Sequence, residues 1–201
     1  MIVVVRHAST NLNEGGDGKE RIRGWMNVPL SKEGHQEALR TAKELKRLQI
    51  PVKDFHTSPL KRAVQTSNPI GSELGVEFDP DERLMDWNVG QFTGNPVDES
   101  LHEIFGYIDN PSKKTPGGES FNDFYNRCAP FLCDLVKDEK THMIVTHNRV
   151  VTLIKALVDG NGEKPLKSTL KKKGPVEPGG ILMVEPDWKM TIIHDHGKSG
   201  V

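Results

Sequence analysis

The sequence predicts an α/β fold, a three-layer sandwich in which helices cover both faces of a mostly parallel central sheet. Strand-like and helix-like segments alternate from residue 1 to residue 158, an order typical of parallel sheets. Two of the strand-like segments, at 1–5 and 143–145, are continuous apolar runs. Runs without polar alternation are typical of strands that are buried on both faces.

The composition predicts one domain over residues 1–201. The chain has 201 residues, of which 35% are hydrophobic and 27% are charged, as in ordinary globular domains. A formal net charge of −1 gives no overall field that would attract nucleic acid or an anionic membrane, so an anion site must be built locally. No apolar segment reaches membrane-spanning length, and Met1 leads directly into a strand, so we expect no signal peptide.

The two cysteines favour a reducing compartment. Cys128 and Cys133 lie five positions apart in one predicted helix, which places them on different faces and disfavours a disulfide. We therefore expect a cytoplasmic protein.

The first strand ends at Arg6 and His7 and leads into a long polar loop at 11–27. Loops of this length are uncommon in compact domains unless they bind a ligand. Ser31 then predicts the N-cap of a helix. That helix extends to about residue 49 and carries an apolar stripe at Ala38, Ala42, Leu45 and Leu48.

The second strand is expected at 52–57. Ser58 and Pro59 follow it as an N-cap and a proline at the first helical position. Arg62 therefore falls in the first turn of a helix that ends near residue 74, close to the carboxyl end of the second strand.

The strand at 143–148 repeats the design of the first one, since it is also an apolar run and it carries His147 at its end. The other expected segments are a third strand at 76–78, an irregular segment at 81–94, a helix at 97–110, a loop at 110–118, a helix at 119–137, a helix at 150–158, a solvated lysine-rich connector at 164–173, and a strand pair at 181–184 and 190–193.

Four side chains are expected to meet at one edge of this sheet. Ligands bind at the carboxyl ends of the strands in open α/β sheets, and Arg6, His7, Arg62 and His147 all follow or end strands there. Two guanidinium groups are suited to a phosphate dianion. Neighbouring cations also lower the pKa of each imidazole, which favours the neutral, nucleophilic form near pH 7.

Residues 6–13, Arg-His-Ala-Ser-Thr-Asn-Leu-Asn, resemble the Arg-His-Gly-x-Thr-x-x-Asn signature of the histidine phosphatase superfamily, which has a phosphoglycerate-mutase-like fold. Further segments resemble the rest of the family pattern in the same order, and together they cover nearly the whole chain. They are the substrate loop at 21–25, the first helix start at 29–31, the second-arginine motif at 58–63, the acid loop at 84–94, Pro-Gly-Gly-Glu-Ser at 116–120, and Val-Thr-His at 145–147.

This resemblance implies a phosphohistidine mechanism without a metal or another cofactor. His7 would attack phosphorus in line and carry the phosphoryl group. Asp86, at the acidic position of the family, would protonate the leaving oxygen and then activate water. Arg6, Arg62 and His147 would bind the oxygens of the transferring group, with Asn13 assisting. The further candidate substrate-binding residues are Thr10, Arg21, Arg23 and Asn148.

Three departures from the family pattern affect this interpretation. Ala8 replaces the usual glycine, which is tolerable only if the backbone there does not need a positive φ. Asp86 stands where glutamate is commoner, so its carboxyl group has a shorter reach. Asn148 and Arg149 stand where small residues are usual. If Arg149 faces the pocket, it favours a substrate with a second anionic group.

Several functions remain open, and the sequence favours hydrolysis of a small phosphomonoester. The protein is expected to be a monomer or a homodimer. A phosphomutase is disfavoured because family mutases carry an extended basic segment after the acid loop, whereas residues 95–118 are short. A non-catalytic module that binds a phosphorylated ligand stays open because of Ala8 and Asp86. A metallohydrolase that uses His7 and His147 is disfavoured, since two arginines beside the site would repel a cation.

Overall fold

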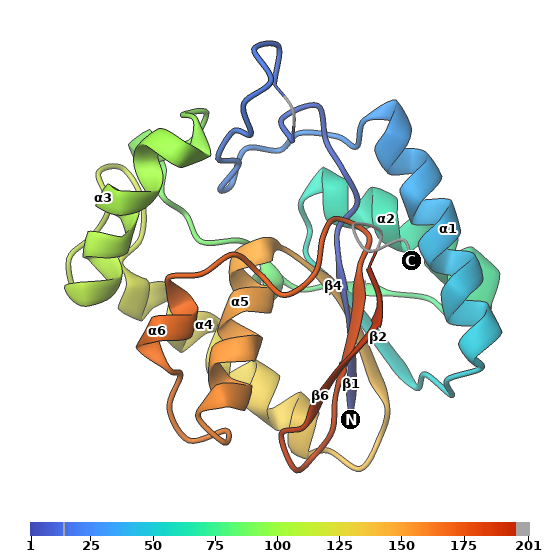
Figure 1. The fold of residues 1–201 in the computed structure, drawn as a ribbon. Coiled ribbons are helices and arrows are strands. Elements are labelled where there is room, and N and C mark those ends of the chain that lie inside the picture. Colours follow the sequence, from blue (N-terminus) through green and yellow to red (C-terminus); the bar gives the residue numbers. More distant parts are fainter. Residues whose placement is uncertain (14, 196–201) are drawn as a thin grey trace, which may run out of the picture.

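One six-stranded sheet forms the centre of the molecule (Figure 1), and its strand order is β3-β2-β4-β1-β5-β6. The computed structural model describes residues 1–13 and 15–195. β3, β2, β4 and β1 are parallel, whereas β5 is antiparallel to β1 and β6 is antiparallel to β5. The strands are β1 (Ile2–Arg6), β2 (Asp54–Thr57), β3 (Asp79–Pro80), β4 (His142–Thr146), β5 (Ile181–Val184) and β6 (Met190–His194).

Helices cover both faces of the sheet, so the prediction of a three-layer α/β sandwich is confirmed. Ile2 and Val4 of β1 pack in a core cluster with side chains of α4 and α5. Val3 and Val5 point to the opposite face and pack with side chains of α1 and α2. The four covering helices are α1 (Lys32–Leu48), α2 (Lys61–Leu74), α4 (Phe121–Lys137) and α5 (Asn148–Asp159).

The loop after β1 is fixed against the start of α1. Ser31 is the N-cap of α1, as predicted, and its side chain accepts a hydrogen bond from the Gly34 N–H. A Cβ atom at Gly34 would collide with the carbonyl oxygen of Ser9, so only glycine permits this close approach. Glu37, one turn further along α1, accepts hydrogen bonds from the Ser9 N–H at 2.7 Å and from Ser9 Oγ at 3.0 Å. The backbone that follows His7 is therefore held in one place.

The predicted third strand at 76–78 is wrong. The Val76 N–H donates to the Gly71 carbonyl and ends α2, and the ring of Phe78 packs 5.5 Å from the ring of Phe55. Only at β3 does the chain reach the edge of β2, where His56 pairs with Asp79. The apolar side chains of Val76 and Phe78 therefore pack against the core between α2 and the sheet, and the segment does not form a strand.

The predicted helix start at Ser58 and Pro59 is also wrong, because α2 begins at Lys61 with Leu60 as its N-cap residue. The Ser58 N–H donates to the Val145 carbonyl at 3.0 Å, so the chain continues the β2–β4 pairing for one more residue. Other boundaries differ by one to three residues. α4 begins at Phe121 behind a capping box at Ser120, α5 begins at Asn148, and the strand predicted at 143–148 is β4.

The segment at 164–173 is more than the solvated connector that was predicted. It contains the short helix α6 (Lys167–Leu170), in which Thr169 and Leu170 are buried. Leu170 belongs to the same core cluster as Ile104 of α3 (Val97–Asp109). Figure 1 shows α3 and α6 on the same side of the sheet as α4 and α5. This packing returns the three lysines at 171–173 to the carboxyl edge of the sheet.

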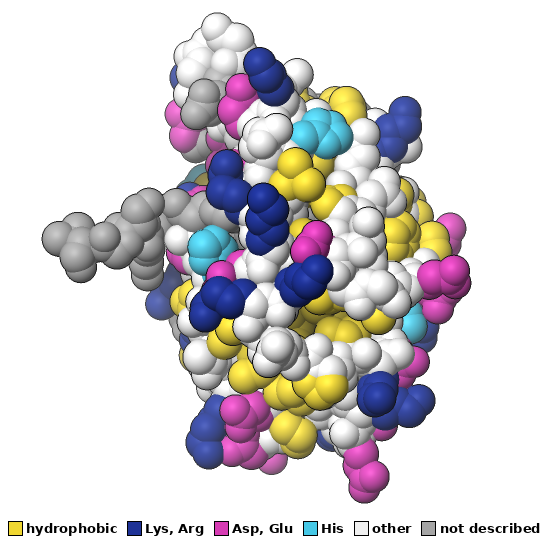
Figure 2. Space-filling view, turned by 90° about the vertical axis from the view of Figure 1, so that its right-hand side faces the viewer, with side chains coloured by type: hydrophobic (Ala, Val, Ile, Leu, Met, Phe, Trp, Pro, Cys, Tyr) yellow, Lys and Arg dark blue, Asp and Glu magenta, His cyan; other side chains and the backbone are white. Residues whose placement is uncertain are grey.

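The face formed by α1 and α2 carries charges of both signs. Figure 2 shows Lys and Arg side chains beside Asp and Glu side chains on it. Two ion pairs lie here, between Lys46 and Glu73 and between Arg47 and Glu44. Among the described residues, no helix combines the length and apolar character needed to cross a membrane.

Candidate active site

Three of the predicted side chains meet at the carboxyl edge of the sheet. His7 follows β1, Arg62 lies in the first turn of α2, and His147 lies between β4 and α5. Arg62 Nε is 3.2 Å from His7 Nε2 and 3.2 Å from His147 Nδ1. The two imidazole ring centres are 5.1 Å apart. One guanidinium N–H is thus shared between two histidines.

The hydrogen-bond partners of His7 fix its tautomer. His7 Nδ1 lies 2.8 Å from the carbonyl oxygen of Ala8, which can only accept, so Nδ1 carries the hydrogen. Nε2 faces the Arg62 N–H and therefore holds a lone pair. The φ angle of Ala8 is not positive, so the alanine in place of the usual glycine introduces no backbone strain there. His7 is therefore a neutral imidazole whose unprotonated Nε2 faces Arg62, and its role as nucleophile stays a prediction.

His147 is oriented by Ser58, a contact that the sequence analysis missed. Since His147 Nδ1 accepts from Arg62, its Nε2 carries the hydrogen and donates to Ser58 Oγ at 2.6 Å. His147 is predicted to donate a hydrogen bond to the transferring phosphoryl group. To do so from Nε2, it would have to give up its hydrogen bond to Ser58 Oγ. The position of Ser58 in the sequence could have indicated this contact, because Ser58 directly follows β2 and therefore lies at the same edge of the sheet as the histidines.

Burial is the main reason why both imidazoles are neutral. It lowers the pKa of His7 well below the usual 6.5, and the guanidinium groups of Arg62 and Arg23 lower it further. The pKa of His147 is lowered in the same way, first by burial and then by Arg62. The direction agrees with the sequence analysis, but burial outweighs the arginines, to which that analysis attributed the effect.

These two lowered pKa values predict that the protein loses stability in mild acid. The unfolded chain binds two protons below about pH 6.5 that the folded chain does not bind. We therefore expect the free energy of unfolding to fall by up to about 2.7 kcal/mol per pH unit from these two groups, between pH 6.5 and 5. Urea unfolding at several pH values measures this slope. His7→Gln should reduce it by about 1.4 kcal/mol per pH unit, and an unchanged slope in that variant would contradict the assignment.

Two arginines beside the histidines have unfilled hydrogen-bond donors. Arg6 donates from Nη1 to the Val176 carbonyl at 2.9 Å, and the same atom lies 3.8 Å from Glu177. Arg23, only 8% exposed, donates from Nη2 to Glu20 at 2.8 Å. Arg6 Nε and Arg23 Nη1 are buried and have no acceptor among the described residues. Buried N–H groups without acceptors are costly, and the oxygens of a bound anion would satisfy them.

Arg62 is held by the loop that precedes α1. Its Nη1 donates to the Met26 carbonyl and its Nη2 to the Gly24 carbonyl, both at 2.8 Å. Burial lowers the pKa values of Arg6 and Arg62 to about 10, so both guanidinium groups remain charged at neutral pH.

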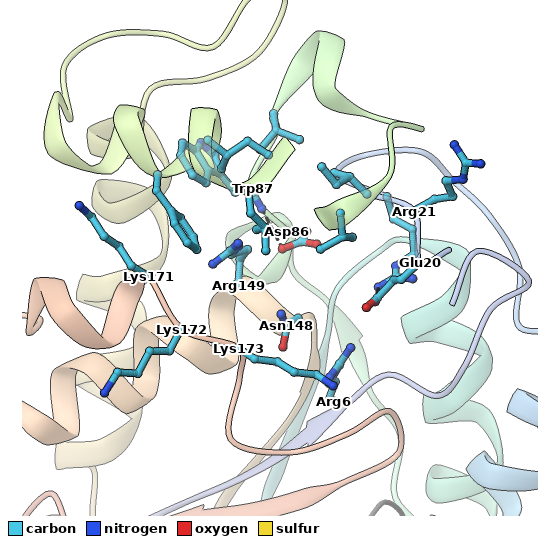
Figure 3. Close-up of a pocket in the computed structure, with 18 residues that line it drawn as sticks. Arg6, Glu20, Arg21, Asp86, Trp87, Asn148, Arg149, Lys171, Lys172 and Lys173 are labelled. Atoms are coloured by element: carbon cyan, nitrogen blue, oxygen red, sulfur yellow. Dashed lines mark hydrogen bonds and ion pairs between the residues drawn. The ribbon is translucent and has the colours of Figure 1, made fainter. Parts of the chain in front are cut away.

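A cavity of about 290 Å³ lies beside this group (Figure 3), because its lining includes Asp86 and Gly24, which both lie next to Arg62. His7, Arg62 and His147 do not themselves line it, and their exposed fractions are 1%, 0% and 0%. Among the described residues, the lining includes seven cationic side chains and two carboxylates, Glu20 and Asp86, in a chain with a net charge of −1. The cations are Arg6, Arg21, Arg23, Arg149 and the lysines at 171–173. The cationic side chains are therefore gathered locally, and anion binding in this cavity stays a prediction.

Asp86 lines the cavity beside the buried group. Its side chain is 14% exposed, and its Oδ2 lies 4.0 Å from Arg62 Nη2. Its Oδ1 accepts a hydrogen bond from the Trp87 N–H at 3.0 Å. The carboxyl group is thus within reach of water and of the guanidinium that joins the histidines.

Arg127 of α4 holds the loop that carries Asp86. Its Nη1 donates to the carbonyls of Glu82, Arg83 and Met85 at 3.0–3.2 Å. Its Nη2 donates to the Asp86 carbonyl at 3.1 Å and to Glu119 Oε1 at 2.8 Å. The sequence analysis missed Arg127, since a single arginine within a helix gives no local signal of a contact some forty residues away.

Two further contacts hold the same loop. Trp25 Nε1 donates to the Asp86 carbonyl at 2.7 Å. A Cβ at Gly90, where φ is +54°, would collide with the Pro116 carbonyl. The acid loop is therefore packed directly against the Pro-Gly-Gly turn at 116–118.

The other predicted binding residues divide into two groups. Asn13 Oδ1 accepts hydrogen bonds from the Thr10 N–H at 2.8 Å and from Thr10 Oγ1 at 3.2 Å, so this pair closes the loop after β1 and does not line the cavity. Its role in phosphate binding stays a prediction. Arg21 lines the cavity and pairs with Asp17. Asn148 also lines it, with a buried Oδ1 that has no donor among the described residues.

The histidines are poorly placed to bind a metal. Both ring nitrogens of His7 are engaged, with Ala8 and Arg62. Those of His147 are engaged with Arg62 and Ser58. Within residues 1–13 and 15–195, no group of three or more His, Cys, Asp or Glu side chains is arranged to hold a metal ion.

Comparison with known proteins agrees with this geometry. The model of the histidine phosphatase superfamily (branch 1) matches residues 2–170. Phosphoserine phosphatase 1 of Hydrogenobacter thermophilus is 29% identical over 153 residues, which are 73% of this chain and 70% of that protein. A 2,3-bisphosphoglycerate-dependent phosphoglycerate mutase of Brucella ovis is 30% identical over 191 residues, which are 87% of this chain and 89% of the mutase.

Solved structures share the fold at lower identity. A mycobacterial glucosyl-3-phosphoglycerate phosphatase in complex with VO3 superposes with a TM-score of 0.74 at 21% identity, and the match covers 95% of this chain and 96% of that one. The α-ribazole phosphatase of Shigella flexneri superposes with a TM-score of 0.71 at 20% identity, covering 95% of this chain and 93% of that one.

Proposed function

Because this chain belongs to branch 1 of the histidine phosphatase superfamily, we propose that it hydrolyses a small phosphomonoester through a phosphohistidine on His7. One observation carries the proposal. A single N–H of Arg62 points to Nε2 of His7 and Nδ1 of His147, and both imidazoles are kept neutral by burial. A neutral nitrogen beside a fixed cation is the arrangement that attack on a phosphate dianion requires.

In the first step, the Arg62 Nε–H leaves His7 Nε2, the freed lone pair attacks phosphorus, and the bond from phosphorus to the ester oxygen breaks. The leaving oxygen takes the proton of the Asp86 carboxyl group. The unfilled donors Arg6 Nε and Arg23 Nη1, with the charge of Arg62, stabilise the oxygens of the transferring group. The products of this step are the free alcohol and phosphohistidine.

In the second step, water attacks the phosphohistidine and the phosphorus–nitrogen bond breaks. The Asp86 carboxylate takes a proton from the attacking water. Inorganic phosphate leaves, and His7 recovers its lone pair. The sum of both steps is the phosphomonoester plus water giving the alcohol plus phosphate, with His7 and Asp86 restored.

A phosphomutase is the second candidate, and one comparison favours it. The mutase of Brucella ovis aligns over 89% of its own length and 87% of this chain, so the short segment at 95–118 does not by itself separate mutases from phosphatases. In a mutase the phosphohistidine would return its phosphoryl group to the substrate rather than to water.

Acid-quenched labelling with a ³²P-phosphomonoester, together with product analysis on 3-phosphoglycerate, tests these alternatives. We expect an acid-labile, base-stable phosphoenzyme and the release of free phosphate. Formation of 2-phosphoglycerate without free phosphate would favour the mutase instead. Absence of both phosphoenzyme and turnover across sugar phosphates, phosphoglycerates, nucleotides and phosphopeptides would leave only a non-catalytic binding module.

A further inference from the structure

The cavity continues past the reaction centre along an apolar wall. Leu101, Ile104 and Phe105 of α3 line this part, and the lysines at 171–173 also line the cavity. Ile104 belongs to the main core cluster and Phe105 packs against it, so the wall is anchored to the body of the protein. Hydrolysis of a phosphoryl group alone would not use this extension.

Arg149 stands between the apolar wall and the reaction centre. Its guanidinium lies 5.4 Å from the ring centre of Phe105, and its Nη1 donates to the Leu170 carbonyl at 3.3 Å. Among the described residues it forms no ion pair within 4.0 Å. Burial lowers its pKa, while the carboxylates of Asp86 and Glu20 act in the opposite direction. A partly buried cation without a carboxylate partner is costly unless a ligand neutralises it.

The surrounding charges favour an anionic ligand at Arg149. Figure 3 shows Lys171 and Lys172 on one side of Arg149, with their amino groups pointing away from it, and Arg6 on the other side. Lys171 is paired with Asp109 at 2.6 Å and Lys173 with Glu177 at 2.6 Å, whereas Lys172 has no carboxylate within 4.0 Å among the described residues.

We propose that Arg149 forms a second anion subsite, and that the substrate is a phosphomonoester whose alcohol part carries a carboxylate or a second phosphate on an apolar body. This inference rests on the proposed phosphatase function. The scissile phosphate occupies the end near Arg6, the apolar body lies against α3, and the second anion reaches Arg149. The cavity volume of about 290 Å³ is at the lower end of the range for small-molecule sites, which favours a metabolite over a phosphoprotein.

A series of aryl phosphates tests the subsite on the whole protein. Phenyl phosphate, 4-carbamoylphenyl phosphate, 4-carboxyphenyl phosphate and 4-(phosphonomethyl)phenyl phosphate share one scissile group and differ in the second group. We expect kcat/KM to be about tenfold or more higher for the carboxylate than for the carbamoyl compound of the same shape, as for one charge-assisted hydrogen bond. The phosphonate shows whether the subsite prefers a carboxylate or a phosphate.

Variants then assign the preference to residues. Arg149→Gln should remove most of the tenfold preference, mainly through KM, and Arg149→Lys should retain part of it. Lys167→Met is the matched control, because Lys167 is exposed in the same segment and does not line the cavity, so the preference should stay unchanged there. If Arg149→Gln fails to fold, the four aryl phosphates still test the subsite on the wild-type protein.

The outcomes separate this inference from the proposed function. Turnover of phenyl phosphate with no preference for either anionic compound would overturn the subsite and leave the phosphatase in place. A preference that survives in Arg149→Gln would also overturn it, because other cations would then hold the second anion. Absence of turnover and of phosphoenzyme with all four compounds would overturn the proposed function itself, and the subsite with it.

Discussion

Replacement of His7 by glutamine is expected to lower kcat/KM by about 10⁴-fold or more, as for removal of other covalent nucleophiles, and to abolish the phosphoenzyme. The amide of glutamine can still donate a hydrogen bond where His7 Nδ1 now meets the Ala8 carbonyl, but it offers no nitrogen lone pair to phosphorus. The site would still bind phosphate through its arginines. Stopped assays with and without acid quench measure both effects.

The matched control is His142→Gln. His142 is buried like His7, but it lies at the start of β4, at the opposite end of that strand from His147. Its Nε2 contacts Asp138 at 2.9 Å, outside the candidate site. We expect this variant to lower stability and to leave turnover within about twofold, because the contacts of His142 lie outside the candidate site. If His7→Gln retained turnover or a phosphoenzyme, another residue would be the nucleophile.

The predictable part of this site is the part that strand ends determine. A buried parallel strand brings whatever follows it to one edge of the sheet. The placement of His7, Arg62 and His147 therefore needed only the strand pattern around 1–7, 52–57 and 143–147. The tautomers did not follow from that pattern, because they depend on the Ala8 carbonyl and on Ser58 Oγ.

The contacts that escaped prediction join segments that are distant in the sequence. Arg127 holds the acid loop some forty residues away, and the lysines at 171–173 reach the cavity only because Leu170 packs beside α3. The strand assignment at 76–78 failed for a related reason. Val76 and Phe78 have high strand propensity, but packing of Phe78 on Phe55 decides their conformation, and tertiary packing overrides such propensities.

Burial changes how the charges of this site should be understood. The sequence analysis attributed the neutral imidazoles to neighbouring arginines, whereas the structure makes burial the larger cause for both histidines. A variant that removes the central cation should therefore disturb binding and transition-state charge far more than it changes the protonation of His7. Arg62 offers this test.

We expect Arg62→Met to lower kcat/KM by about 10³- to 10⁵-fold, the range found for arginines that stabilise phosphoryl transfer. The methionine would leave the Gly24 and Met26 carbonyls and both imidazoles without the donors that Arg62 supplies. Each unsatisfied buried acceptor costs about 1–3 kcal/mol, so the free energy of unfolding should also fall. Steady-state kinetics and urea unfolding measure the two effects.

Arg62→Lys distinguishes charge from geometry. A lysine keeps the positive charge but cannot donate from one planar group to two histidines and two carbonyls at once, so we expect it to restore stability only in part and to recover less than a tenth of the activity. Arg47→Met on the exposed side of α1, where Arg47 pairs with Glu44, is the matched arginine control and should leave turnover unchanged. NMR titration completes the test: in Arg62→Met the pKa of His7 should rise because a cation is lost, yet stay below 6.5 because burial persists. A pKa of His7 that returns to 6.5 would show that the arginine, and not burial, keeps the nucleophile neutral.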